Sequence, residues 1–408
     1  MKKNKILFVV TSFPTLSETF IVNQIVSLIN KGCEVSILCT GHVLRNGVIH
    51  PVVIQNSLMD LVREDIAMPI NKLERVWKGI LNIMRYYKDV AFLLSSFNIF
   101  KYGVASINLR QLYNHLLLLC IKESDCDVMH VHFGDNAVLV NDLLCEYDID
   151  KKMVVTFHGY DAHDFSSEFY RKLKQSRAYY TSNTNFTKNE LMRLGFDTSL
   201  ISVLPVGLDT SFFSPQKKTI DLSRDVKIVF VGRLVKWKGC LFFIELINEI
   251  IAKGSGDVEA VIIGDGVEYS KCVDLISKLN LGDKVVLKGS LLQDEIIKEL
   301  DSADIFLYPG GVDESGRCEN QGLVIQEAQS MGLPVIVSNI GGMPESINHG
   351  VTGFVIDYND KSSFVETTIK LIKSPELRKQ IGKCARNFVI ENYDNKVLAD
   401  EILDIYAK

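Results

Sequence analysis

Two glutamates in the last third of the sequence could bind a ligand rich in hydroxyl groups. Glu319 follows the apolar run Ile305–Tyr308, and Glu327 stands eight residues later, inside a predicted helix. Loops at the carboxyl ends of parallel strands are where doubly wound folds bind ligands, and carboxylates accept hydrogen bonds from the vicinal hydroxyls of sugars. The free N–H groups near Gln321–Leu323, where that helix starts, can receive a phosphate or a sugar hydroxyl. We therefore predict a binding loop at this strand end.

Two cations follow the strand that opens the second half of the chain. Arg233 and Lys238 lie within the stretch 231–239, and a guanidinium fork with an ammonium suits a diphosphate. A solvated basic turn explains these two residues alone equally well. Gly264 and Gly266 end the next strand, where they could let a nucleotide base approach the backbone or merely form a turn. Neither leading strand is followed by G-x-x-x-x-G-K-[ST] or G-x-G-x-x-G, which argues against a P-loop and a dinucleotide site.

The candidates in the first half of the chain have structural alternatives. Thr15 and Glu18 stand three residues apart and fit a capping box at a helix start, although the amides of Ser12–Ser17 follow the first strand and could touch phosphate. His130 and His132 alternate on a strand. No carboxylate or third histidine lies at ligand spacing, so we expect no metal site there.

Short apolar runs separated by helix-like stretches must position these residues. This pattern is typical of parallel doubly wound sheets, and it starts twice, so the sequence predicts two successive Rossmann-like α/β domains. The predicted strands are Ile6–Val10, Glu34–Leu38, Val128–Phe133, Met153–Phe157, Ala178–Thr181 and Ile201–Leu204, and then Lys227–Gly232, Glu259–Gly264, Val285–Leu287, Ile305–Tyr308 and Pro334–Val337.

A polar stretch that contains Pro and Gly, Gly207–Asp225, predicts the boundary between the two domains. We expect one domain over residues 1–207, with a helical insertion at about 60–122, and a second over residues 208–389. From Pro375 onward the sequence predicts two helices with a break near Asn392–Asp394. The segment 390–408 is expected to pack back on the N-terminal domain.

Composition excludes several classes of protein. The chain has 408 residues, which is too long for one typical core, and a net charge of -5 argues against nucleic acid as a partner. No apolar stretch is long enough to span a membrane. The nine cysteines are scattered without a C-x-x-C pair, a pattern typical of reduced thiols and a cytoplasmic location.

The stretch 72–122 differs from the rest of the chain, because aromatic and basic residues interleave there at helical spacing. Examples are Trp77 and Tyr86 beside Lys78 and Arg85. Such a segment can lie on an anionic membrane or can be a helical insertion packed on the first domain. The two interpretations stay open, and so does peripheral attachment to the inner face of the cell membrane.

Motifs spread over the whole chain, from Ile6 to Tyr406, resemble those of a known family. They are Ser12-Phe13-Pro14-x-x-Ser17-Glu18-Thr19-Phe20-x-x-Asn23-Gln24, His132-Phe133-Gly134, Phe157-His158-Gly159-x-Asp161, Pro205-x-Gly207-x-Asp209, Gly232-Arg233-Leu234-x-x-x-Lys238-Gly239 and Glu319-x7-Glu327. The series is similar to that of retaining family-four glycosyltransferases with the GT-B fold, which build bacterial exopolysaccharide and O-antigen repeats. The Ser-Glu-Thr-Phe start resembles the colanic-acid and amylovoran type.

The resemblance implies a GT-B fold, in which two doubly wound domains face a central cleft and the C-terminal one binds the nucleotide-sugar donor. Arg233 and Lys238 would clasp the donor diphosphate, Glu327 would accept hydrogen bonds from the ribose, and Glu319 would hold hydroxyls of the transferred sugar. The backbone around Gln321, Gly322 and Leu323, and that of Gly264 and Gly266, would complete the donor site.

The resemblance also assigns residues of the N-terminal, acceptor-binding domain. His158 would line the reaction centre near the donor sugar, and Asp161, Ser17 and Glu18 would lie in the acceptor cleft. One departure concerns the donor loop, since the family usually has Gly where this chain has Asn320. Asn tolerates a positive φ better than most residues, so we expect the turn to persist.

The expected reaction is a retaining transfer of a hexose from a nucleotide-sugar to a hydroxyl of a growing glycan, carried on a polyprenol diphosphate, in O-antigen or exopolysaccharide biosynthesis. No metal and no cofactor are expected, because Arg233 and Lys238 would stabilise the charge that grows on the β-phosphate. The alternatives are a sugar-nucleotide epimerase or hydrolase on the same fold, and a non-catalytic scaffold of an assembly complex. An NAD-dependent oxidoreductase is a more distant alternative, because its glycine fingerprint is missing.

Overall fold

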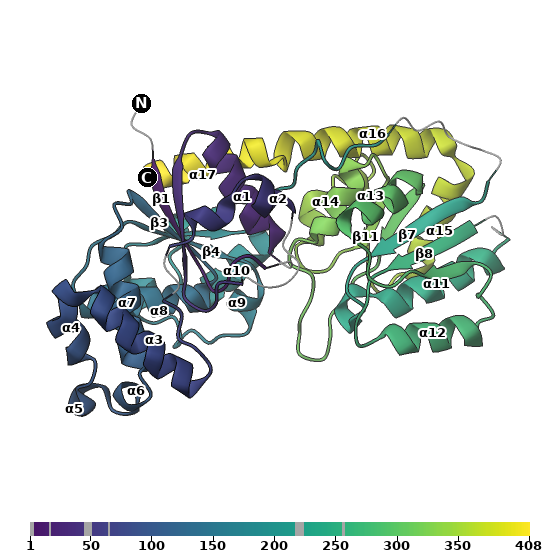
Figure 1. Cartoon of the computed structure of the whole chain (residues 1–408). Coiled ribbons are helices and arrows are strands. Elements are labelled where there is room, and N and C mark those ends of the chain that lie inside the picture. Colours follow the sequence, from purple (N-terminus) through teal and green to yellow (C-terminus); the bar gives the residue numbers. More distant parts are fainter. Residues whose placement is uncertain (1–3, 16–17, 45–50, 64–65, 217–223, 255–257) are drawn as a thin grey trace. The chain divides into compact units, whose positions relative to one another are not determined.

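The chain folds into two compact units, which are described separately (Figure 1). The computed structural model describes residues 4–408 apart from 16–17, 45–50, 64–65, 217–223 and 255–257. Unit 1 comprises Met1–Ser182, Lys188–Val203 and Glu401–Lys408, and unit 2 comprises Asn183–Thr187 and Leu204–Asp400.

Unit 1 is built on a parallel sheet with six strands among the described residues, in the order β2-β1-β3-β4-β5-β6. Their apolar runs are buried on both faces, as expected where helices cover a parallel sheet on both sides. Among these helices, α8 packs on β3 and β4, and α1 packs on β2. The strands are β1 (Lys5–Val10), β2 (Glu34–Cys39), β3 (Val128–His132), β4 (Met153–Phe157), β5 (Tyr179–Ser182) and β6 (Ile201–Val203), and the helices outside the insertion are α1 (Thr19–Asn30), α8 (Gly134–Glu146), α9 (Tyr160–His163), η3 (Leu173–Gln175), η4 (Thr198–Leu200) and α10 (Asn185–Arg193), the start of which, up to Thr187, belongs to unit 2.

A helical insertion separates β2 from β3. Its last helix carries the run of leucines between Leu116 and Leu119, which is buried in the core of unit 1. Helix α3, which precedes the short helices in the middle of the insertion, packs against this last helix. The insertion consists of α2 (Pro51–Gln55), η1 (Leu58–Leu61), α3 (Lys72–Arg85), η2 (Tyr87–Asp89), α4 (Val90–Ser95), α5 (Ile99–Tyr102), α6 (Val104–Ile107) and α7 (Arg110–Lys122).

Unit 2 repeats the architecture, and its described strands form a six-stranded parallel sheet in the order β12-β11-β10-β7-β8-β9. α11 packs against α12 and α15, and α14 packs against α16 (Figure 1). The elements are β7 (Val226–Val231), η5 (Lys236–Lys238), α11 (Cys240–Ala252), β8 (Val258–Ile263), α12 (Tyr269–Lys278), β9 (Val285–Leu287), α13 (Gln293–Ser302), β10 (Ile305–Tyr308), α14 (Leu323–Ser330), β11 (Val335–Ser338), η6 (Met343–Ser346), β12 (Gly353–Ile356), α15 (Lys361–Lys373), α16 (Pro375–Asn392) and α17 (Asn395–Ala407), the last residues of which belong to unit 1.

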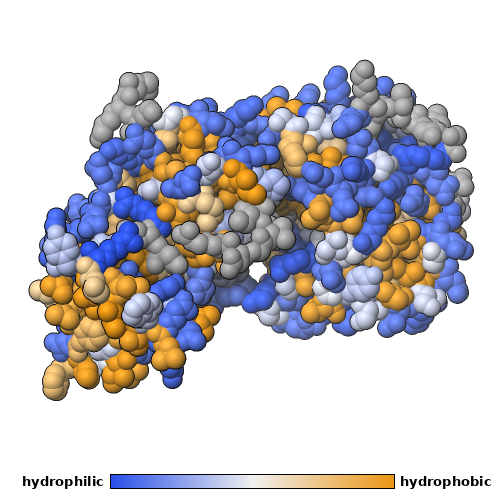
Figure 2. Space-filling model, viewed as in Figure 1, coloured by the Kyte–Doolittle hydropathy of each residue, from blue (hydrophilic) through white to orange (hydrophobic). Residues whose placement is uncertain are grey.

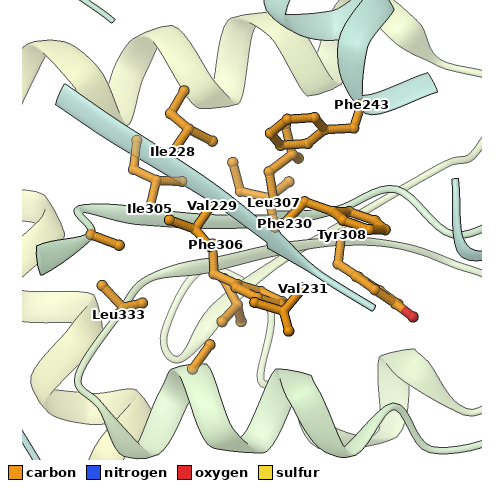
Figure 3. Close-up of a cluster of buried hydrophobic side chains, with 14 of the residues drawn as sticks. Ile228, Val229, Phe230, Val231, Phe243, Ile305, Phe306, Leu307, Tyr308 and Leu333 are labelled. Carbon is orange, nitrogen blue, oxygen red and sulfur yellow. The ribbon is translucent and has the colours of Figure 1, made fainter. Parts of the chain in front are cut away.

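The core of unit 2 is centred on the two adjacent strands β7 and β10, whose side chains pack with Phe243 and Leu333 in Figure 3. Tyr308 ends β10 and is fully buried, yet its hydroxyl points out of the apolar cluster. The strand therefore delivers a polar atom to the carboxyl edge of the sheet.

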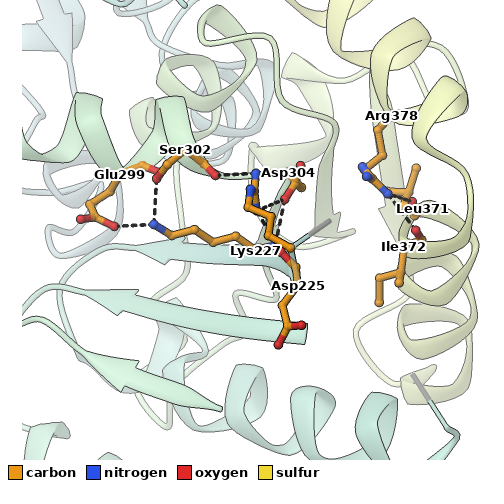
Figure 4. Close-up of polar contacts among 9 residues, drawn as sticks. Asp225, Lys227, Glu299, Ser302, Asp304, Leu371, Ile372 and Arg378 are labelled. Carbon is orange, nitrogen blue, oxygen red and sulfur yellow. Dashed lines mark hydrogen bonds and ion pairs between the residues drawn. The ribbon is translucent and has the colours of Figure 1, made fainter. Parts of the chain in front are cut away.

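Charged residues at the opposite, amino edge of the same sheet have structural partners (Figure 4). The Lys227 ammonium lies 2.8 Å from Glu299 and donates to the Ser302 hydroxyl at 2.8 Å. The Lys227 backbone N–H and the Arg224 guanidinium both donate to Asp304. These pairs fasten the start of β7 to the end of α13, so this charged cluster is satisfied by the fold itself.

The predicted fold class is confirmed, because the chain forms two parallel sheets with helices on both sides. All eleven predicted strands are present among the described residues, and no strand end differs from its predicted position by more than one residue. The break near Asn392–Asp394 is confirmed between α16 and α17. The strand β12 was not predicted, because its four residues follow Gly350 and Thr352 in a stretch without a longer apolar run.

The predicted capping box at Thr15 is wrong. Helix α1 begins at Thr19, and its N-cap position is held by Glu18, whose side chain makes no capping hydrogen bond. The spacing of the two residues was compatible with a cap, but the helix starts one turn later than the pattern required.

The units divide after Val203, whereas the sequence placed the domain boundary after Gly207. Residues Glu401–Lys408, which include the end of α17, belong to unit 1, where the Tyr406 hydroxyl lies 2.6 Å from Nδ1 of His130 and Lys152 donates to the Tyr406 carbonyl. Within the described residues, no helix is both long and apolar enough to cross a bilayer.

Candidate active site

In unit 2, the loops that leave β7 and β8 are joined through their backbones at the carboxyl edge of the sheet. The N–H of Gly232 donates to the Ile263 carbonyl at 2.9 Å, and the N–H of Leu234 donates to the Asp265 carbonyl at 2.8 Å. A Cβ on Gly264 would overlap the Gly232 carbonyl oxygen, and the φ of Gly264 is +141°, which favours glycine. A Cβ on Gly266 would lie 2.5 Å from the Leu234 carbonyl oxygen, which is also too close. The packing of the two loops therefore requires glycine at both positions, whether or not a nucleotide base approaches the backbone there.

The same packing carries Lys238 to the end of β10. Gly239 has a φ of +82°, and a Cβ there would overlap the Pro309 carbonyl oxygen. The N–H of Gly311 donates to the Trp237 carbonyl at 2.8 Å. Because the short helix η5 is fixed against the loop after β10, the Lys238 ammonium reaches the carboxylate of Glu319.

Glu319 is the centre of a small polar cluster. Its Oε2 accepts a hydrogen bond from the Tyr308 hydroxyl at 2.7 Å and pairs closely with Lys238. Burial alone would raise the pKa of Glu319, but Lys238, Tyr308 and then Arg233 hold that pKa below its usual value. Glu319 is therefore ionised at neutral pH, with a cation already beside it. The Arg233 guanidinium is exposed and lies over the Trp237 ring, 5.7 Å from its centroid.

The turn after Glu319 leads into α14. Gly322 is its N-cap residue, with a φ of 75°, and a Cβ on it would lie 2.8 Å from Ile325 and 3.2 Å from Glu319 Cγ. The Gln321 side chain is occupied, since it exchanges two hydrogen bonds with the Val206 backbone. The N–H groups at the start of α14, on Gln321, Gly322 and Leu323, have no acceptor among the described residues, as expected of a first helical turn.

The expected reason for tolerating Asn320 is wrong. Asn320 does not have a positive φ, and in this turn the left-handed residue is Gly322. Asn320 is instead held through its side chain, whose oxygen accepts hydrogen bonds from the hydroxyls of Thr184 and Thr187. Asparagine thus fixes the loop by hydrogen bonds that a glycine could not make.

Glu327 lies in the second turn of α14, where burial raises its pKa to about 7. No described residue pairs with its carboxylate. A half-buried carboxyl without a partner in the protein can exchange its proton near neutral pH and can accept hydrogen bonds from a hydroxylated ligand.

Unit 1 places His158 directly after β4, at the carboxyl edge of the first sheet. Its Nε2 lies 2.9 Å from Nδ1 of His132, the last residue of β3. Burial lowers the pKa of His158 to about 3, and that of His132 falls well below its usual value for the same reason, so both rings are neutral. The Nε2 of His132 has no partner among the described residues. The tautomer with the His132 proton on Nδ1 therefore leaves no buried N–H unpaired, and it makes His158 Nε2 an acceptor and its Nδ1 a donor.

Asp161 was predicted to lie in the acceptor cleft, but its carboxylate is fully buried beneath the loop. Oδ1 accepts the N–H groups of His158 and Gly159 at 2.9 Å, and Oδ2 accepts the N–H of Gly134 at 2.8 Å. Burial raises the pKa of Asp161 to about 7, although these three N–H groups oppose the shift. Asp161 thus fixes the loop that carries His158 and ties it to the start of α8.

The histidine pair considered for a metal is explained by packing. His130 is fully buried between the Tyr406 hydroxyl and the Thr156 hydroxyl, which lies 2.7 Å from Nε2, and its ring stacks on that of His132. His158 is a third histidine that sequence spacing did not bring together with these two. The ring nitrogens of the three histidines form hydrogen bonds with one another and with hydroxyls. No group of three His, Cys, Asp or Glu among the described residues could hold a metal ion.

Of the remaining predicted residues, Ser17 lies outside the described residues. Glu18 is half-buried at the start of α1, and burial raises the pKa of its carboxyl. Phe20, in the first turn of α1, packs on His158 with a ring-centroid distance of 4.7 Å.

Sequence reasoning missed the contributions of four residues to these sites. Tyr308 binds Glu319 but was read as part of a buried strand, and His132 was weighed only as a metal ligand. Gly341 and Gly342 pack so closely on the Glu319 and Asn320 carbonyls that neither could carry a side chain without displacing the loop. The Gly-Gly pair after the strand 334–337 was the available signal for such a close approach.

Comparisons with known proteins identify the families that the chain resembles. The family described as glycosyl transferases group 1 matches residues 214–388, and glycosyltransferase family 4 matches residues 17–212. The chain is 28% identical to the amylovoran biosynthesis glycosyltransferase AmsK of Erwinia amylovora over 90% of each chain. It is 25% identical to the putative colanic acid biosynthesis glycosyltransferase WcaL of Escherichia coli K12, over 98% of this chain and 99% of that one.

A third relative carries its reaction in its name. UDP-Gal:alpha-D-GlcNAc-diphosphoundecaprenol alpha-1,3-galactosyltransferase of Escherichia coli is 28% identical over 70% of this chain and 76% of its own length. Two solved structures share the fold, each with a TM-score of 0.72. They are a glycosyltransferase from Rickettsia africae, 20% identical and covering 100% of this chain and 98% of that one, and HepE of Anabaena in complex with UDP, 15% identical and covering 99% of both.

The two family matches together account for nearly the whole chain, one for each half. The first half of the chain is therefore a domain of glycosyltransferase family 4 and the second a domain of the group 1 glycosyl transferases, and the protein is a transferase with the GT-B fold.

Proposed function

We propose that this enzyme transfers a hexose from a nucleotide-sugar to a hydroxyl of a growing glycan, with retention at the anomeric carbon and without a metal ion. The cluster of Lys238, Glu319 and Tyr308, with Arg233 beside it, is the observation that carries the proposal. It combines cations for a diphosphate with an ionised carboxylate for sugar hydroxyls at one strand edge.

The proposed chemistry follows from these charges. The bond between the anomeric carbon and the β-phosphate oxygen breaks, a bond to the acceptor oxygen forms on the same face, and the acceptor proton passes to the departing phosphate. Arg233 and Lys238 stabilise the negative charge that grows on the diphosphate, the task a divalent cation performs elsewhere. When the diphosphate binds, Lys238 shares its charge with it, and Glu319 becomes available to the sugar hydroxyls.

We assign donor recognition to Glu327, which accepts hydrogen bonds from the ribose, and to the N–H groups of Gln321–Leu323. His158, held by His132 and Asp161, donates through Nδ1 to the transferred sugar. Gly264 and Gly266 give the nucleotide base access to the backbone.

The proposed acceptor is a glycan on a polyprenol diphosphate in exopolysaccharide or O-antigen assembly, and the enzyme would act in the cytoplasm at the inner face of the membrane. The names of the amylovoran, colanic acid and diphosphoundecaprenol relatives support this proposal.

The test is a transfer assay with purified enzyme and UDP-, GDP- and dTDP-hexoses, with and without a polyprenol-diphosphate-linked glycan. We expect a product only when acceptor is present, and NMR should show the anomeric configuration of the donor retained. Consumption of the donor without acceptor would favour the epimerase or hydrolase alternative. No turnover and no binding of any nucleotide-sugar would favour a scaffold.

A further inference from the structure

Apolar side chains are concentrated on one exposed face of unit 1. Of the 28 large apolar side chains exposed among the described residues, 15 lie between Ile70 and Ile107. Figure 2 shows a largely hydrophobic area where Figure 1 places the helices α3 to α6. An exposed apolar area of this kind marks an interaction surface in a protein that is otherwise well covered. We call it the α3–α6 face.

Helix α3 has its apolar side on the outside. Exposed apolar side chains stand at 73, 76, 77, 80, 81 and 84, which at 100° per residue fall within about 140° of its circumference. The residues that α3 buries include Gly79 and Asn82, which lie on the side that packs against α7. A surface helix of a globular protein normally shows the reverse arrangement.

The short helices α5 and α6 repeat this inversion. Phe100 is fully exposed, and Val104 and Ile107 are 72% and 67% exposed. The buried residue of α6 is Ser106, whose hydroxyl donates to the carbonyls of Ser96 and Asn98. Buried polar groups thus stabilise α5 and α6, while the apolar side chains of these helices face outward.

The α3–α6 face is anchored to the rest of unit 1. The Arg75 guanidinium donates to the carbonyls of Pro69, Ile70 and Asn108, and the Tyr113 hydroxyl donates to the Arg75 carbonyl. At the far end, the Tyr102 hydroxyl lies 2.9 Å from that of Tyr147. The exposed side chains therefore belong to a fixed surface.

The net charge of the α3–α6 face indicates what kind of partner binds there. Residues 72–110 contain seven cations and two carboxylates, a net charge of +5 in a chain whose total is -5. Arg75 is used inside the fold, and Lys101 pairs with Glu146, but Lys72, Lys88 and Arg110 are exposed around the apolar area. A symmetric dimer through this face would bring two positive surfaces together. An anionic lipid surface complements both its charge and its apolar side chains.

We propose that the α3–α6 face docks on an anionic phospholipid bilayer, with Leu73, Trp77 and Phe100 inserted among the acyl chains and the cations at the headgroups. The exposed apolar and basic residues favour docking whatever reaction the enzyme catalyses, but the purpose of docking rests on the proposed function. A polyprenol-linked acceptor lies in the same bilayer, so docking would hold unit 1 where that acceptor is found.

Vesicle flotation tests the proposal. The protein is mixed with phosphatidylcholine vesicles with and without phosphatidylglycerol, and we expect it to float with the anionic vesicles and to be partly released by salt. Leu73→Glu/Phe100→Glu should lower partitioning about tenfold or more. Leu292→Glu, a leucine of similar exposure (71% against 83%) in unit 2, is the matched control and should float as the wild type. Equal flotation of all three proteins, or none with either vesicle, would overturn the proposal.

A second measurement distinguishes a membrane from a second copy of the chain. The sequence has two tryptophans, so Trp237→Phe leaves Trp77 as the only one. Its emission should shift to the blue with anionic vesicles and stay constant when the protein is concentrated without lipid. A dimer in light scattering that Leu73→Glu dissociates would show that the face is a protein interface and overturn the proposal. Because donor binding is measured without lipid, failure of docking and failure of the proposed function are distinguishable.

Discussion

The buried carboxyl of Glu327 predicts how donor affinity depends on pH. With a pKa of about 7, it is mostly protonated at pH 6 and mostly ionised at pH 8. If the carboxylate is the form that accepts the ribose hydroxyls, the ionised fraction and hence the association constant rise about tenfold over this interval. Glu327→Gln keeps the shape of the protonated group, so its affinity should be low and nearly independent of pH.

The stability of the free protein should change in the opposite direction. Burial raises the pKa of Glu327 above its unfolded value of about 4.5, so its contribution to the free energy of unfolding is present below that pH and is lost as the pH rises through about 7. Glu327→Gln has no ionisable group at this position, so its free energy of unfolding does not fall for this reason as the pH rises. At pH 8 the ligand-free variant should therefore melt at a higher temperature than the wild type, although it binds the donor more weakly.

Isothermal titration with an intact nucleotide-sugar measures the affinity, since a diphosphate diester does not titrate near neutral pH. Melting is followed at pH 6 and pH 8 in the same buffers. Parallel pH profiles for wild type and Glu327→Gln would refute the assignment of this carboxyl to the nucleotide. A variant that is less stable than the wild type at pH 8 would refute the argument from burial.

Four further predictions concern the polar clusters. Lys238→Met should lower kcat about a hundredfold, or about 3 kcal/mol, whereas Lys236→Met, an exposed lysine in the same turn, should change it less than about twofold; similar losses would contradict the diphosphate assignment. Glu319→Ala should slow transfer with a smaller loss of nucleoside diphosphate affinity than Glu327→Ala, and calorimetry showing equal losses would count against the assigned roles. His132→Phe should lower kcat about tenfold by releasing its neighbouring histidine, with donor KM unchanged, and should also lower Tm because a buried ring nitrogen loses its partner; an unchanged kcat would make the residue merely structural. Activity should persist in EDTA, and its loss and recovery with magnesium or manganese would show that a metal is needed.

The sheets were predictable because parallel strands buried on both faces leave unbroken apolar runs in the sequence. Residues 353–356 escaped because a strand of four residues beginning with glycine leaves no such run. The cluster around Glu319 was partly predictable, since its members follow strand ends. The role of Tyr308 was not predictable, because an apolar run does not reveal whether the hydroxyl of a buried tyrosine reaches the edge of the sheet.

Other features depended on packing that sequence does not record. The family resemblance placed Asp161 in the acceptor cleft, but the loop turns its carboxylate inward to three N–H groups. The stretch from 72 showed an amphipathic helix, yet periodicity alone does not tell which side faces the core. Gly79 and Asn82, on the buried side of that helix, resolve the question only once the structure is known.

The contact between Tyr406 and His130 has a consequence for how the chain is completed during synthesis. The strand that carries His130 leaves the ribosome early, but its buried imidazole receives the Tyr406 hydroxyl only after every residue of unit 2 has been translated. Domains generally fold as they emerge, the earlier one first. Here unit 1 emerges first but is completed only after unit 2 has been made, and until Tyr406 arrives the site beside His130 that its hydroxyl fills is open to water.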